Sequence, residues 1–176
     1  MNTLKRILLI IGLLLAPASS LPAMQADWIK FAPPGGGFSV LLPAQPKELE
    51  LTPVPDFSAH GYGVTVDGVV YVCLFGDYAA SVHLNPDAEL AANRDNFLKA
   101  LNASLISTKK IELDGRAGLE FTGESADSNL QSQVYLVGNR VYQIAIAVPK
   151  GTDASADASR FLKSFAFAGN KEHAKP

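Results

Sequence analysis

The chain contains 176 residues, of which 48% are hydrophobic, and carries a formal charge of −2 at pH 7. A chain of this length predicts one domain with its own hydrophobic core. The mildly acidic charge, without a block of like charges, argues against nucleic acid or an anionic membrane as the partner.

The first 26 residues have the pattern of a secretory signal peptide. Lys5 and Arg6 form a basic head, residues 7–16 form an apolar run, and residues 17–26 are mostly small or polar. The run is shorter than the ~20 residues that a membrane-spanning helix needs. We expect removal of residues 1–26, which changes the formal charge from −2 to −4 because Lys5 and Arg6 leave. The expected product is periplasmic or secreted, without a stable membrane span.

Short strands are predicted in the next segment, at residues 27–31 and 38–43, on either side of a Pro-Gly turn at 33–37. The glycines of this turn lack the Lys-Ser/Thr pair of a phosphate-binding loop. A third strand, at 47–52, is bracketed by four prolines. Because proline cannot donate to a strand ladder, we expect this strand at a sheet edge.

Three dipeptides predict β-hairpins. They are Asp67-Gly68 between strands 59–66 and 69–78, Asp114-Gly115 between 108–113 and 116–123, and Gly138-Asn139 between 131–137 and 140–148. These hairpins predict an antiparallel sheet of about six to eight strands. Residues 69–75 are apolar on both faces, which indicates an interior strand covered on both sides.

Two helices are expected to pack on this sheet. Asn85 and Pro86 suit the start of a helix that runs to about residue 102. A second helix is predicted at about 155–164. Their apolar stripes consist of Leu90, Phe97, Leu98 and Leu101, and of Ala158, Phe161, Leu162 and Phe165. The organisation is therefore a signal peptide at 1–26, one α+β domain at 27–168 and a polar tail at 169–176.

No catalytic constellation can be recognised. Cys73 is the only cysteine, so no internal disulfide can form, and its apolar strand predicts a buried, inert thiol. His60, His83 and His173 lack metal-ligand spacing, and no serine lies in a Gly-x-Ser-x-Gly setting. We expect no cofactor and no enzymatic activity. A metal site that the fold builds from His60, His83 and Asp77, or an enzyme site assembled only by the fold, stays as an alternative.

Arg94 breaks the apolar pattern of the first helix, because it falls near the middle of the stripe. Its stem could cover apolar surface while its head reaches water. It could instead pair with a sheet carboxylate, Glu120 or Asp77, or line a pocket for an anionic ligand. Between the pair and the pocket we favour the pair, and we name Arg94, Glu120 and Asp77 as the candidate ligand-binding residues. A tyrosine platform is a further alternative, if several of Tyr62, Tyr71, Tyr78, Tyr135 and Tyr142 share an open face.

Several segments together resemble one family. They are Phe38 to Pro43 with Pro46, the helix after Asn85-Pro86, the hairpin from Gly138 to Gln143, and the closing Phe161 to Phe165. This order of parts resembles the PsbP-like and DcrB-like group of exported bacterial and plastid proteins, over about Trp28 to Phe167. The resemblance implies an α/β/α sandwich around an antiparallel sheet. It also implies a non-enzymatic accessory or envelope protein, with no catalytic residue to transfer. Members of the DcrB-like branch are often lipoproteins, and this chain lacks the anchoring cysteine.

Two functions follow as expectations. The first is an exported, monomeric, non-enzymatic domain that binds an envelope protein, which predicts an exposed apolar or aromatic patch. The second is a small-molecule carrier, which predicts a cavity between helix and sheet with Arg94 in its wall.

Overall fold

The computed structural model describes residues 27–169. The predicted signal peptide lies outside this range, as does the predicted polar tail beyond Gly169. The described elements are β1 (Ile29–Phe31), β2 (Phe38–Leu42), β3 (Lys47–Glu48), β4 (Phe57–Val66), β5 (Val69–Tyr78), α1 (Pro86–Ala100), β6 (Ser104–Leu113), β7 (Arg116–Glu124), β8 (Ser128–Val137), β9 (Arg140–Pro149), α2 (Ser155–Lys163) and β10 (Ala166–Phe167).

Seven strands form one antiparallel sheet in the order β3-β4-β5-β9-β8-β7-β6. This confirms the predicted α+β class and the predicted number of strands. The apolar strand β5 lies inside the sheet, between β4 and β9, and its Cys73 is fully buried. A second, three-stranded sheet in the order β1-β2-β10 was not predicted.

The hairpin turns follow from local chemistry. Asp67 and Gly68 have φ of 49° and 80°, and Asp114 and Gly115 have φ of 54° and 75°. Two successive positive φ values define the type I′ turn, whose twist matches that of the flanking strands. Strand β6 begins at Ser104, four residues before its predicted start at residue 108. A β-bulge between Leu105 and Ser107 interrupts the alternating pattern there, so the pattern did not indicate the first residues of the strand.

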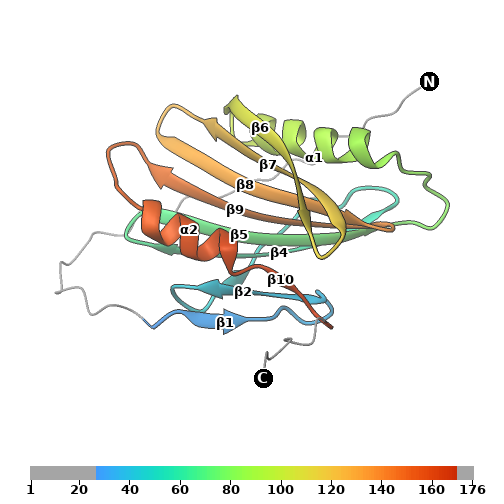
Figure 1. The fold of residues 1–176 in the computed structure, drawn as a ribbon, viewed down its shortest axis with the longest axis horizontal. Helices are drawn as coiled ribbons and strands as arrows, with labels where there is room; N and C mark the ends of the chain where they lie inside the picture. Colours follow the sequence, from blue (N-terminus) through green and yellow to red (C-terminus); the bar gives the residue numbers. More distant parts are fainter. Residues whose placement is uncertain (1–26, 170–176) are drawn as a thin grey trace.

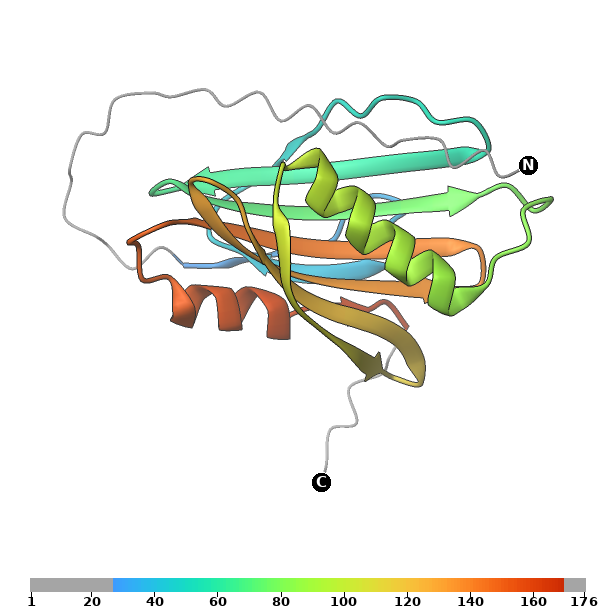
Figure 2. The ribbon, with the colours of Figure 1, turned by 90° about the horizontal axis from the view of Figure 1, so that it is seen from above.

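The two faces of the large sheet have different covers. Helix α1 lies over one face, whereas α2 and the small sheet lie on the other side (Figure 1). Strand alternation separates the two cores. Phe121 and Val134 face α1, while Tyr71, Ile144 and Phe161 belong to the core on the α2 side. Seen from above, α1 crosses its face obliquely, with β4 to one side of it (Figure 2). It packs on β6, β7 and β8.

Candidate functional site

Helix α1 is fixed at its start and along one side. The side chain of Asn85 accepts a hydrogen bond from the backbone N–H of Ala88 (3.0 Å), and Pro86 occupies the first turn. Leu90 and Leu98 are buried in the core that includes Phe121. The helix is therefore a firm wall for any site on this face.

Arg94 does not form the predicted pair with Glu120 or Asp77. Its Nε donates instead to Oδ1 of its neighbour Asp95 at 2.8 Å, and its Nη1 lies 3.5 Å from the Thr108 hydroxyl. The reason is strand alternation. Because Leu119 and Phe121 face α1, Glu120 between them projects to the opposite face, and Asp77 likewise alternates with Gly76 and Tyr78. The sequence pattern identified the apolar stripe of α1, but it did not indicate which residues of the sheet face that stripe.

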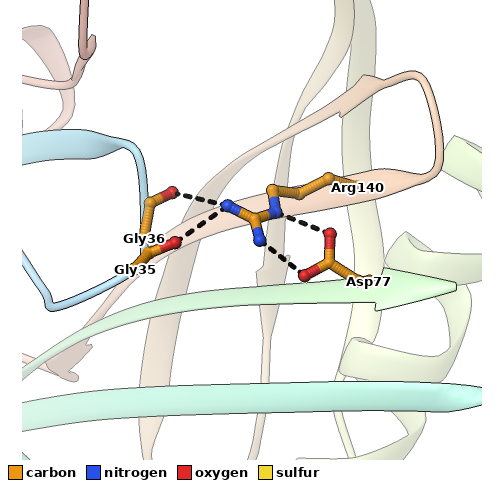
Figure 3. Close-up of polar contacts among 4 residues, drawn as sticks. All are labelled: Gly35, Gly36, Asp77 and Arg140. Carbon is orange, nitrogen blue, oxygen red and sulfur yellow. Dashed lines mark hydrogen bonds and ion pairs between the residues drawn. The ribbon is translucent and has the colours of Figure 1, made fainter.

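Asp77 belongs to a clamp between the two sheets. Nε and Nη2 of Arg140 donate to the two carboxylate oxygens of Asp77 at 2.7 and 2.6 Å. Nη1 of Arg140 donates to the carbonyl oxygens of Gly35 and Gly36 at 2.9 and 3.5 Å, as Figure 3 shows. The guanidinium also lies 5.5 Å from the centroid of the Phe75 ring. The clamp thus ties the β1–β2 turn to strands β5 and β9.

Replacement of Asp77 tests this clamp, because the contribution of its carboxylate to the unfolding free energy should depend on pH. The hydrogen bond from Arg140 lowers the pKa of Asp77 below its ordinary value. Because the pKa of Asp77 is lower in the folded chain than in the unfolded chain, its ionised carboxylate stabilises the fold at pH values above the unfolded pKa of about 4. This stabilisation is lost as the pH falls through the pKa of the folded chain. We expect Asp77→Asn to cost roughly 1 kcal/mol of unfolding free energy at pH 7, since the pair is half exposed, and much less at pH 3.

Urea unfolding at the two pH values measures this difference. The control is Asp127→Asn, since Asp127 is exposed and forms no ion pair among residues 27–169. An equal loss at pH 7 and pH 3 would show that the Asp77 charge does not carry the effect.

Glu120 takes part in a third, separate group. Its carboxylate accepts hydrogen bonds from Lys109 at 2.7 Å and from Gln133 at 2.9 Å, and Gln133 in turn accepts from the Tyr135 hydroxyl at 3.1 Å. Burial opposes ionisation of Glu120, but these hydrogen bonds outweigh it, so its pKa is lowered. The three candidate residues therefore do not form one site.

A depression between α1 and β6 contains Arg94. Its volume is about 320 Å³, and Lys109 and Lys110 line it together with Asp87 and Leu119. Lys110 is paired with Asp87 at 2.9 Å, and Lys109 with Glu120. Each cation of this depression thus already has a carboxylate partner, which weakens the attraction for an anionic ligand.

Two apolar hollows lie on the other side of α1, and sequence reasoning missed both. The first has a cavity volume of about 60 Å³, between the helix and strands β4, β5 and β9. The second, of about 150 Å³, lies near the C-terminal end of the helix. We call the two hollows together the α1 trough. Its walls are Leu51, Phe57, Ala59, Leu74, Phe75, Asn93, Asn96, Phe97, Ala100, Val141 and Gln143 in the first hollow, and Val70, Val72, Phe97, Leu101, Ser125, Ser128, Leu130, Ala145, Ile146 and Ala147 in the second.

Three amide side chains give the first hollow its polar groups. Gln143 is 7% exposed in the middle of the sheet, and its Nε2 donates to the Ser132 hydroxyl at 3.1 Å. Asn93 Nδ2 donates to the Glu89 carboxylate at 2.8 Å, which also accepts from the Tyr78 hydroxyl. Asn96, on the same helix, also lines the hollow. The only sequence signal was Gln143 within an otherwise apolar strand.

The other candidate groups lie apart. Burial raises the pKa of the Cys73 thiol to about 12, so it has little thiolate character at neutral pH. His60 stacks on Phe75 at 4.9 Å between ring centroids. Within residues 27–169, no three His, Cys, Asp or Glu side chains are grouped to hold a metal ion.

The five tyrosines do not share one open face, so they form no binding platform. Tyr71, Tyr135 and Tyr142 are buried in the core on the α2 side. The partly exposed Tyr62 packs against that same core, whereas Tyr78 belongs to the α1 side. Neither helix in the described range has the length and hydropathy that a membrane span requires.

Comparison with family models and with curated proteins gives no match. The chain has a PsbP-like α+β fold, as the sequence resemblance predicted. The solution structure of cyanobacterial PsbP (CyanoP) from Synechocystis sp. PCC 6803 matches with a TM-score of 0.56 and 10% identity, over 85% of this chain and 98% of that one. A crystal structure from Bacteroides thetaiotaomicron VPI-5482 matches with a TM-score of 0.44 and 17% identity, over 84% of this chain and 50% of that one.

Proposed function

We propose that this chain is an exported, non-enzymatic accessory domain that binds a protein partner in the cell envelope through the α1 trough. The observation that carries the proposal is the trough itself, an apolar recess beside a firmly held helix. Such recesses on a folded domain are typical of binding surfaces rather than of packing, since interiors are close-packed. The basic and apolar pattern of residues 1–26 supports export.

The size of the recesses favours a protein segment over a small molecule. Ligand pockets usually measure about 300–1,000 Å³ and enclose most of their ligand. The two hollows measure about 60 and 150 Å³. Volumes of this order fit single side chains, such as a leucine or a phenylalanine that projects from a partner helix or loop. Phe97 lines both hollows, so one partner segment could place a side chain on each side of it.

The carrier alternative is favoured by a different observation. The depression that contains Arg94 is the largest of the three recesses described here, at about 320 Å³. Its cations are paired within the chain, so an anionic ligand would have to displace Asp87 or Asp95. We therefore keep the carrier as the second candidate.

The test replaces Asn96, at the wall of the first hollow, with a photo-reactive amino acid in the protein's own host. We expect irradiation to cross-link one envelope protein through residue 96. With that partner purified, Asn96→Arg should weaken binding at least tenfold, because a charged side chain would be forced against apolar walls.

The matched control is Asn129→Arg, the same change at an exposed site on the opposite sheet face. Equal weakening by both variants, or cross-links of equal yield from residues 96 and 129, would contradict a binding surface at α1. Native mass spectrometry of the protein from its host decides on the carrier, since a reproducible excess mass of a small molecule would favour it.

A further inference from the structure

The two edges of the large sheet differ in length and composition. Strand β3, at one edge, has two residues, and prolines at positions 43, 46, 53 and 55 flank it. Strand β6, at the other edge, has ten residues and no proline. Within residues 27–169, the strand neighbour of β6 is β7 alone. The prolines around β3 therefore prevent a further strand from pairing at that edge, whereas nothing of this kind protects the edge at β6.

The free edge of β6 offers backbone groups rather than an apolar face. In an antiparallel pair, about half of the N–H and C=O groups of an edge strand point away from its neighbour. Seven successive residues, Ser104 to Lys110, are exposed. No backbone hydrogen bond outside the strand ladder involves residues 105–113 among the described bonds. A row of such groups is complementary to one kind of occupant, an extended polypeptide.

Two apolar side chains mark one end of this edge. Leu105 and Ile106 are 41% and 62% exposed, and they are the exposed large hydrophobic residues of the described part of the chain. The β-bulge between Leu105 and Ser107 interrupts the ladder here, so regular pairing can run from Ser107 to Leu113. An added strand would pair over this stretch, and an apolar residue just beyond its end would lie against Leu105 and Ile106.

The charges on β6 distinguish between a second copy of this chain and a different protein. Lys109 and Lys110 are 65% and 75% exposed. Antiparallel pairing of two copies, centred on residues 107–113, would place Lys110 opposite Lys110, which is destabilising. An acidic residue at that place would instead be attracted by Lys110, because the pair of Lys110 with Asp87 is largely exposed and therefore weak, whereas Lys109 projects to the opposite face, toward Glu120. The edge is thus guarded against self-association and complementary to acidic strands.

We infer that the free edge of β6 receives an extended segment of a partner protein, in which apolar and acidic residues alternate, by strand addition. This inference deepens the proposed partner-binding function and rests on it for the identity of the partner. It concerns the sheet edge rather than the α1 trough, so the two can fail separately.

The test titrates the isotope-labelled protein, as its host processes it, with a capped seven-residue peptide of alternating valine and glutamate. We expect the NMR shifts to concentrate in residues 104–113 and in β7. Lys110→Glu should weaken binding roughly fivefold or more, because attraction becomes repulsion. This variant should fold, since the Lys110–Asp87 pair that it removes is largely exposed. Melting by circular dichroism checks this.

Two controls complete the design. Lys163→Glu makes the same charge change on exposed α2, and a peptide with lysine in place of glutamate keeps the apolar pattern. We expect Lys163→Glu to leave binding of the glutamate peptide unchanged. We expect the lysine peptide to bind the original protein at least fivefold more weakly than the glutamate peptide does. Shifts centred on α1 or β3, or equal effects of the two variants, would overturn the inference. So would a dimer in sedimentation that Ile106→Asp dissociates, since the occupant would then be a second copy.

Discussion

Phe161→Ala should be among the most destabilising single substitutions in this chain, with an expected loss of about 3–5 kcal/mol in unfolding free energy. Phe161 is fully buried, on the face of α2 that packs on the large sheet. Its ring meets that of Tyr71 edge to face, with 5.4 Å between centroids. Removing the ring forfeits both the burial of the side chain and the contacts of its neighbours, because a close-packed core collapses only in part.

The measurement is urea unfolding followed by tryptophan fluorescence. Trp28 is the only tryptophan, and it lies 5.7 Å from Tyr71 and under the guanidinium of Arg160 of α2. Its emission therefore reports on this layer. Phe161→Leu is the control and should cost clearly less, since it keeps most of the buried volume. A loss below about 1.5 kcal/mol for Phe161→Ala would show that α2 does not anchor the α2-side core.

The parts of the fold that local chemistry determines could be predicted from the sequence. Asp67-Gly68 and Asp114-Gly115 adopt the successive positive φ values that their hairpin turns require. Asn85 caps α1 as its type and position indicated. These elements need no knowledge of distant residues. The same reasoning placed the interior strand β5, because a strand that is apolar on both faces must be covered on both.

The parts that distant pairing determines could not be predicted. Strand β10 has two residues and no periodic pattern, and it forms because Ala166 and Phe167 pair with Ser39 and Phe38 of β2. This pairing adds the third strand to the small sheet, in which β1 already pairs with β2. Sequence patterns do not indicate contacts of that separation when each strand is so short.

The candidate site shows the same division. The sequence identified Arg94 as unusual, and its side chain is indeed largely covered, at 17% exposure. It could not show that α1 packs on the face that Leu119 and Phe121 present, and hence that Glu120 projects away from the helix. The α1 trough likewise arises from where the helix crosses the sheet, which no single segment specifies.

Phe121→Ala should destabilise the chain about as strongly as Phe161→Ala, by about 3–5 kcal/mol, but with a different local consequence. Phe121 is 1% exposed on the α1 side of β7, and its ring lies 6.0 Å from that of Phe97, between centroids. Its loss leaves a cavity beneath the helix that carries the α1 trough. We therefore expect a higher ratio of the hydrogen-exchange rate of the α1 amides to that of the α2 amides than in the unchanged protein, because α1 loses its support.

Hydrogen exchange under conditions where the variant stays folded measures this contrast, and Phe121→Leu is the control that keeps most of the volume. In Phe161→Ala the ratio should move the other way, with faster exchange in α2. If α1 and α2 accelerated equally in both variants, the two cores would unfold as one unit, and the helix could not be displaced on its own. Faster exchange of α1 alone would mean that the wall of the trough can move without unfolding the sheet, which would let the trough adapt to the side chains of a partner.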